Sequence, residues 1–313
     1  MNGNSGDASP INENAALASA RAARASFMCA SAADWIARKQ PRDITGVLLL
    51  ALACAALLIV YARVLPSAGV AGLSMVVLLA IFFASALSSI AGFAFSAICG
   101  AILFHLMSGQ VRIVEVMMVC SIAIQALSVW ALRSTIDWRV LPAFLVGGLV
   151  GLPAGVWLLL NLSQRVYVQG MGVLLALYGI YMLFRRPIYL QRDFGALGDA
   201  AAGVFGGITG GLAGFPGALV TIWCGVKGWD RRRQRSVYQP FILIMQIAAL
   251  IAIHLMRGRG SAELDPVVWA YIPAALLGSW CGLALFARLT DRQFTMVVNL
   301  LLIVSGVGLT GLL

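Results

Sequence analysis

Apolar segments recur along the chain from Ile44 to its end, separated by short polar or basic loops. Each can supply about 20 residues, the length of a helix that crosses the hydrocarbon core of a bilayer. Because lipid offers no hydrogen bonds, the backbone of each segment must satisfy its own polar groups, as a helix does. The pattern predicts an all-α polytopic membrane protein with about nine to eleven membrane segments.

The segments are preceded by a tail of different composition. Residues 1–40 are rich in Ala, Ser and Asn and lack the early apolar core of a signal peptide, so we expect a cytoplasmic, largely disordered tail. An additional transmembrane helix is expected at 41–66, a first transmembrane repeat at 67–184, a basic cytoplasmic linker at 185–195 and a second repeat at 196–313. The long apolar stretches lie at 70–107 and 196–226, and the single spans at 113–132, 140–160, 166–184, 237–256, 267–287 and 294–313.

The two sets of segments resemble each other. "AGFAFSA" at 91–97 aligns with "AGFPGAL" at 213–219, and "GLPAGVWLLLNLSQR" at 151–165 aligns with "GSWCGLALFARLTDR" at 278–292. Polar landmarks align as well: Gln125 with Gln246, and Arg112 with Arg233. The chain is therefore predicted to be an internal duplication, a recurrent plan among transporters.

The distribution of Lys and Arg predicts the topology. If the N-terminus is cytoplasmic and each long stretch enters and leaves on the same side, more basic residues lie in cytoplasmic segments than if each long stretch crosses once. Equivalent positions in the two repeats are then separated by an odd number of membrane crossings. The two repeats are therefore expected to have opposite orientations in the membrane. We expect a multi-pass protein of a bacterial inner membrane.

Composition narrows the class of function. The chain is 61% hydrophobic and 11% charged, with a mean hydropathy of +0.93, whereas soluble domains carry about 25% charged residues. The net charge of +10 is explained by cytoplasmic loops, and no nucleic-acid module is visible. With two histidines, and cysteines mostly in apolar segments, we expect no metal, no cofactor and no catalytic residues.

A glycine cluster, "GGITGGLAGFPGA" at 206–218, interrupts the second long stretch. Gly and Pro at this density break a helix, and a helix restarting near Phe215–Pro216 would aim free amides at an anion. The alternative is that the glycines only allow close helix packing, as we expect for the ladder Gly147, Gly151 and Gly155. The first half carries the counterpart "SSIAGFAFSA" at 88–97.

Polar side chains inside the spans are few. Gln125 and Gln246 sit near the middle of equivalent helices, where they either bind substrate or only join helices. Among acidic residues only Glu115 is assigned to a span, with His105 and His254 near span ends, and these three are candidates for ion coupling or for structural roles at the interface. The run "KGWDRRRQR" at 227–235 either sets topology or gathers anions at the cytoplasmic mouth.

At these residues the chain resembles the sulfite exporter TauE/SafE family over roughly 70–313. The resemblance rests on "AGFAFSAICGAILFHL", "GGLAGFPGALVTIW" and "DWRVLPAFLVGGLVGLPAG". The family's glycine motif usually reads GxGGG, and both halves depart from it. The resemblance implies a transporter of sulfite, sulfonates or related organic anions.

We therefore expect a secondary transporter that exports a small, sulfur-containing anion by alternating access, driven by a gradient because no ATP-binding motif is present. The rivals are an intramembrane enzyme and a non-transporting scaffold, and homo-oligomerisation is left open. The expected partners are the anion and the lipid bilayer. The expected substrate-binding residues are Gly92, Phe93, Ser96, Gln125, Gly214, Phe215, Pro216, Gly217 and Gln246, with Arg112 and Arg233 attracting anions at the two mouths.

Overall fold

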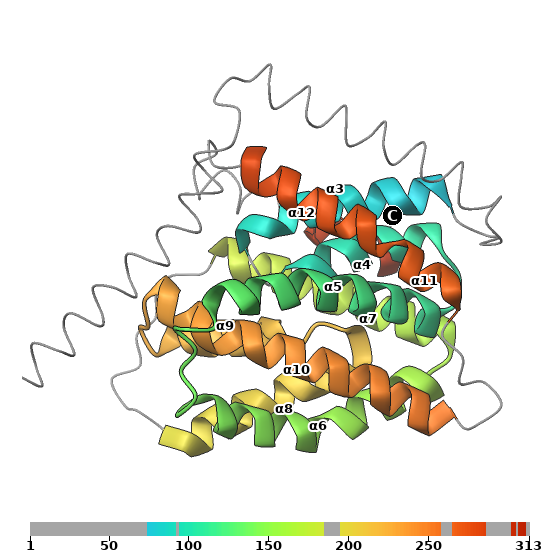
Figure 1. The fold of residues 1–313 in the computed structure, drawn as a ribbon. Helices are drawn as coiled ribbons and strands as arrows, with labels where there is room; N and C mark the ends of the chain where they lie inside the picture. The colour runs from blue at the N-terminus through green and yellow to red at the C-terminus, as the bar shows by residue number, and fades with distance from the viewer. Residues whose placement is uncertain are drawn as a thin grey trace, which may run out of the picture.

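The computed structural model describes residues 74–91, 94–184, 195–257, 265–285, 302–304 and 306–310, and all regular structure in these ranges is helical. The expected tail at 1–40 and the helix at 41–66 lie outside the described residues, as does nearly all of the linker. The helices, which form a layered bundle (Figure 1), are α3 (Met75–Ala91), α4 (Phe95–Leu106), α5 (Gln110–Leu132), α6 (Leu141–Asn161), α7 (Gln164–Phe184), α8 (Gly195–Ala213), α9 (Gly217–Val226), α10 (Arg231–Arg257), α11 (Pro266–Ala270) and α12 (Ile272–Leu285).

Three of the described helices are long and apolar enough to cross a bilayer: Gln110–Trp130, Leu141–Asn161 and Arg233–Arg257. Shorter apolar helices accompany them, among them α4 and α9. The prediction of a helical chain with several long apolar segments is confirmed. In the span expected at 267–287, only Tyr271 separates α11 from α12, and it keeps a right-handed helical conformation, so that Val267–Gly282 forms one shorter apolar segment.

Both long apolar stretches are broken, as predicted. α3 ends at Ala91 and α4 begins at Phe95, while α8 ends at Ala213 and α9 begins at Gly217. Within each stretch the two helices pack against each other. Near the free ends of α8 and α9, Asp199 pairs with Lys227, so the second stretch enters and leaves the bundle at the same end.

Two tight helix pairs form opposite edges of the bundle, α6 with α8 and α3 with α12, and α5 and α10 pack together between them (Figure 1). Glycines make both pairs close. A Cβ at Gly151 would collide with the carbonyl oxygen of Val204, and a Cβ at Gly278 would collide with that of Phe82. The small-residue ladders therefore serve helix packing, as predicted.

Candidate functional site

The break between α8 and α9 is a glycine turn. Gly214 has a φ of 64°, a left-handed conformation that side chains with a Cβ rarely adopt. The backbone amides of Gly214 and Phe215 turn back to α8, donating to the carbonyl oxygens of Gly210 (2.9 Å) and Thr209 (3.3 Å). The turn therefore satisfies the end of α8 and leaves the start of α9 to other partners.

The start of α9 has no side-chain cap among the described residues. Pro216 occupies the N-cap position, where the sequence predicted that a helix restarts, and it has no N–H of its own. The start of α4 is uncapped in the same sense, with Ala94 at its N-cap. Two helix N-termini without a side-chain cap from their N-cap residue thus lie inside an apolar bundle, each with the positive end of its dipole there, an arrangement that suits an anion.

Gln246 of α10 joins the two breaks. Its Nε2 donates to the carbonyl oxygen of Gly214 at 3.0 Å and to Ser96 Oγ, in the first turn of α4, at 3.4 Å. The residue is only 1% exposed, and its Oε1 has no hydrogen-bond partner within the described parts of the chain. A buried acceptor without a hydrogen-bond donor destabilises the fold by about 1–3 kcal/mol. A ligand that donates a hydrogen bond to Oε1 would remove this cost.

The structure brings part of the expected site together. Ser96, Gly214 and Gln246 meet through the bonds above, and Phe215 is buried beside them, its ring 5.3 Å from that of Tyr178 in an edge-to-face contact. Gln125 is buried in α5. Gly92 and Phe93 lie outside the described residues.

Two glycines of the predicted cluster 206–218, Gly207 and Gly211, serve packing rather than the break. An added Cβ at Gly207 would collide with a carbonyl oxygen of α6, as would one at Gly203 just before the cluster, and one at Gly211 would crowd the same helix. Gly206 and Gly210 face Pro216 instead, where they make room for the turn. The packing alternative is therefore correct for part of the cluster, and the turn itself depends on Gly214.

A charged cluster marks the end of the bundle where α5 starts and α10 finishes. Glu115 is buried and forms a 2.7 Å ion pair with Arg257. His254 and Arg112 lie close enough to interact electrostatically with its carboxylate. Arg112 itself pairs with Asp265 at 2.6 Å. Of the three coupling candidates, Glu115 and His254 are therefore neighbours. The third, His105, is exposed at the end of α4.

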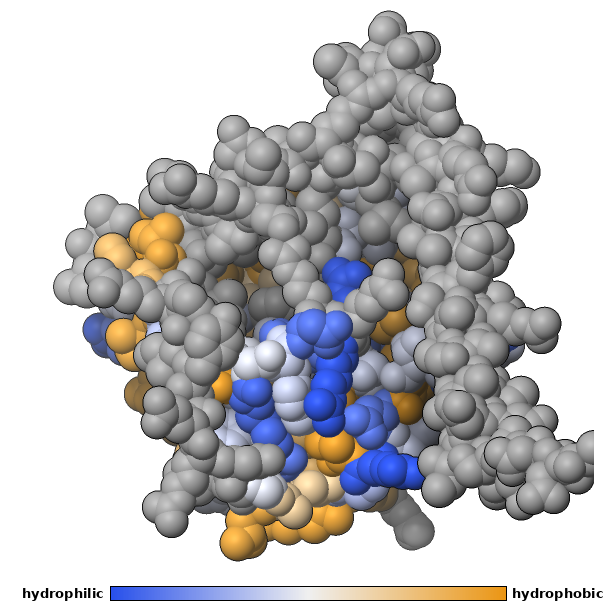
Figure 2. Space-filling model, turned by 90° about the vertical axis from the view of Figure 1, so that its left-hand side faces the viewer, coloured by the Kyte–Doolittle hydropathy of each residue, from blue (hydrophilic) through white to orange (hydrophobic). Residues whose placement is uncertain are grey.

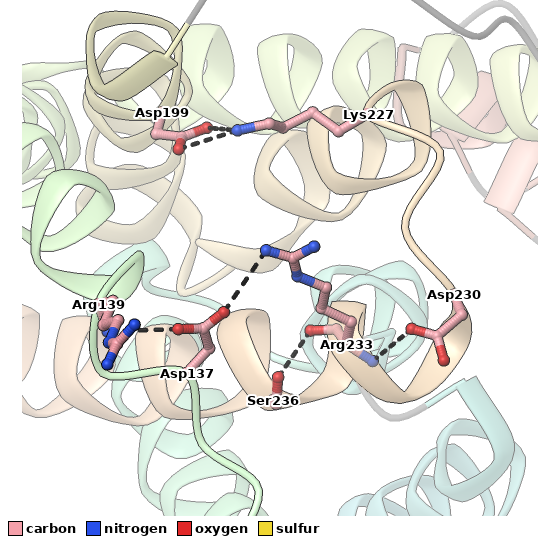
Figure 3. A network of polar contacts seen from close by, with 7 residues as sticks. All are labelled: Asp137, Arg139, Asp199, Lys227, Asp230, Arg233 and Ser236. Atoms are coloured by element: carbon pink, nitrogen blue, oxygen red, sulfur yellow. Dashed lines mark hydrogen bonds and ion pairs between the residues drawn. The ribbon is translucent and has the colours of Figure 1, made fainter. Parts of the chain in front are cut away.

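The opposite end holds a second set of charges. Asp199 accepts from Lys227 Nζ at 2.9 Å and from Trp223 Nε1 at 2.7 Å, and both charged side chains are nearly buried. Arg233 lies 3.7 Å from Asp137. Figure 3 shows both pairs, and Figure 2 shows hydrophilic side chains gathered at this end of the bundle.

Asp199 is a buried acidic residue that sequence reasoning missed. It lies five residues into α8, inside the long stretch 196–226, although Glu115 was taken as the only acidic residue within a span. The sequence does contain a signal for this pair. If the long stretch enters and leaves the membrane on the same side, an Asp near its start and a Lys just after its end lie close enough to pair. Arg233, expected as an anion attractor, is half-exposed and stacks on the Trp229 ring at 4.5 Å.

Comparison with known proteins gives one match. A protein-family model described as "Sulfite exporter TauE/SafE" matches residues 77–309. Neither the curated proteins nor the solved structures yielded a match. Within the described residues no group of three His, Cys, Asp or Glu side chains is placed to hold a metal ion.

Proposed function

We propose that the protein exports a small sulfur-containing anion, sulfite or an organosulfonate, by alternating access. The chain belongs to the sulfite exporter TauE/SafE family, whose members are membrane transporters and not enzymes. The assignment of the chain as a multi-pass membrane transporter follows from the family and from its long apolar helices. The choice of anion and the direction of transport are the proposal.

The anion site is proposed at the meeting point of the two breaks. One observation carries it: Gln246 bonds both Gly214 at the second break and Ser96 beside the first. Two uncapped helix N-termini lie next to the residues it joins, and helix N-termini attract negative charge. Each carboxylate among the described residues is paired with a cation or a backbone amide near one end of the bundle rather than at the breaks.

Inverted repeats are proposed as the basis of alternating access. In the alignment of the two halves, Gly151 corresponds to Gly278, and Val204 corresponds to Phe82. Gly151 of α6 packs on the carbonyl of Val204 in α8, and Gly278 of α12 packs on that of Phe82 in α3. The next turn repeats the contact with Gly155 on Ile208 and Gly282 on Ala86. Each half thus packs on the other through equivalent residues, which supports a pseudo-two-fold relation.

The proposed orientation has the N-terminus and the 227–235 loop in the cytoplasm of a bacterial cell, with the chain in the inner membrane. The basic run 227–235 and the start of α10 support it, because Lys and Arg favour the cytoplasmic side. Single-cysteine labelling of intact cells tests it: residue 234 should be protected and residue 109 labelled. Labelling at 234 would reverse the orientation.

Proton coupling is proposed for Glu115 and His254, which are neighbours near the end that this orientation assigns to the periplasm. His254 Nδ1 is buried, and no described residue pairs with it. Flux under an imposed pH gradient should fall with His254→Asn and with Glu115→Gln. His105→Asn, at the third candidate, which is exposed at the end of α4, is the comparison variant, and unchanged gradient-driven flux in the first two variants would remove them as proton carriers.

Flux into proteoliposomes tests the function itself. Purified protein should exchange radiolabelled sulfite or a simple alkylsulfonate across the membrane, and Gln246→Leu should slow that exchange by about tenfold or more, since a binding contact near 1.4 kcal/mol is worth one decade. A protein that moves no anion in any gradient would point to the scaffold alternative.

A further inference from the structure

The carboxamide of Gln246 has a fixed direction. The Gly214 carbonyl oxygen only accepts hydrogen bonds, so the side-chain nitrogen must face it, and this nitrogen also reaches Ser96 Oγ. Both hydrogens of the nitrogen are thereby used. The oxygen Oε1 is left enclosed, and no described residue donates to it.

Oε1 changes what the anion site can accept. The starts of α4 and α9 attract negatively charged oxygens, whereas Oε1, an acceptor, repels them. An anion with acceptor oxygens alone would satisfy the amides and leave Oε1 unpaired. An anion that also carries an O–H or N–H group satisfies both.

On the basis of the proposed anion site, we propose that the preferred substrate is a small oxyanion carrying its own hydrogen-bond donor, which binds Gln246 Oε1 while the negatively charged oxygens face the starts of α4 and α9. The donor has two chemical sources. It is either the acidic proton of a half-neutralised oxyacid, such as hydrogen sulfite, or a hydroxyl or amino group on an organosulfonate.

Gln110 supplies an internal control. Its Nε2 also donates two hydrogen bonds, to the carbonyl oxygens of Leu159 (2.9 Å) and Leu162 (2.8 Å), and its Oε1 is also enclosed without a partner among the described residues. It faces the C-terminal end of α6, however, and the partial charge there is negative, so no anion is expected beside it. The two glutamines share their bonding pattern and differ in the helix ends that they contact.

The experiment compares anions of similar size in proteoliposomes. 2-Hydroxyethanesulfonate and propane-1-sulfonate differ by a hydroxyl in place of a methyl group, and 2-aminoethanesulfonate, a zwitterion whose protonated amino group is the donor, provides the amino arm. The donor-bearing sulfonates should bind at least about tenfold more tightly than propane-1-sulfonate, because a site built around a polar partner discriminates against the analogue that lacks it. The charge-matched comparison is the one with 2-hydroxyethanesulfonate.

The second arm uses sulfite at fixed total concentration. Apparent affinity should fall as the pH rises and hydrogen sulfite is converted to the dianion, while propane-1-sulfonate, measured alongside, corrects for effects on the protein. A preference in this arm alone identifies the acid proton as the donor, and a preference in the sulfonate arm alone identifies the hydroxyl or amino group. Either supports the inference.

Variants assign the preference to one atom. Gln246→Met should remove the preference between the isosteres, and Gln110→Met should keep it. Gln246→Asn, which retains the amide but withdraws it by one methylene, should reduce the preference and serves if the Met variant does not purify. A preference that survives both Gln246 variants would overturn the inference.

The two proposals fail differently. Equal affinity for all these anions in the wild-type protein, with no pH dependence for sulfite, would overturn the donor requirement and leave anion transport standing. Absence of transport for every anion tested would overturn the proposed function as well.

Discussion

Glycine performs two different tasks in the same helix, and the contrast separates scaffold from site. Along α8, Gly203 and Gly207 lie against the backbone of α6, where any side chain would collide with a carbonyl oxygen. At the end of α8, a Cβ at Gly214 would meet only side chains, the nearest being Met118 at 3.2 Å, and glycine is favoured there by the positive φ. Gly203 and Gly207 are needed because they lie against another backbone, and Gly214 is needed because of its backbone conformation.

The difference shows that glycine density alone does not identify a binding site. The α6–α8 contact face holds more glycines than the break, but there they bring two backbones together and leave no room for a ligand. The break holds few, and beside it lie an uncapped helix start and a buried amide. Substitutions at each place should therefore fail in different ways.

The largest effect is expected on the contact face. Gly207→Ala places a Cβ on the carbonyl oxygen of Gly148, and since neither backbone can yield, the helix pair should separate and little monodisperse protein should purify. Gly170→Ala in α7, where a Cβ would meet nothing within 4 Å, is the matched control and should be neutral or slightly stabilising. Size-exclusion profiles of the two variants decide it, and a normal profile for Gly207→Ala would refute the close packing.

A somewhat smaller effect is expected at the base of the α8–α9 hairpin. Lys227→Met leaves the nearly buried Asp199 without its cation, and breaking a buried pair costs about 3–5 kcal/mol. The double variant Asp199→Asn/Lys227→Met should recover most of that loss, because no uncompensated charge remains. Thermal unfolding in detergent measures both, and equal loss in single and double variants would contradict the pairing.

At the break the effect on stability should be modest and the effect on transport large. Gly214→Val forces a β-branched residue into a left-handed conformation, at a cost of roughly 1–2 kcal/mol, and should shift the start of α9. Gly214→Asn, which tolerates this conformation, is the matched variant and should retain more activity. Comparable transport in the two variants would show that backbone geometry at the break does not matter.

The smallest effect is expected at the exposed pair Arg112–Asp265, whose side chains are 46% and 38% exposed. Arg112→Gln should change stability by less than about 1 kcal/mol. Asp265→Asn completes a double-mutant cycle. The asparagine keeps an oxygen that can accept the hydrogen bond from the Val267 backbone amide, which Asp265 Oδ1 accepts at 3.0 Å. A coupling energy of several kcal/mol in that cycle would mean that the pair is not screened by water.

The sequence predicted those features that depend on local composition. Apolar length gave the helices, and the residues around Gly214 and Pro216 gave the break, because both properties act within one or two turns. It did not predict that Gly203, Gly207 and Gly211 belong to packing, since this depends on which helix lies opposite. Nor did it predict the contact of Gln246 with Ser96, which joins residues that only the folded bundle brings together.

The closeness of α6 and α8 also bears on how the chain is made. The flat glycine face of α6 is complete once residue 161 has been synthesised, but its complement in α8 follows only after α7 and the residues up to 213. Until then α6 lacks its partner on that face. Membrane insertion of the first half and its final assembly are therefore separate events in time, and a ribosome that stalls between them leaves behind a chain that cannot close on itself.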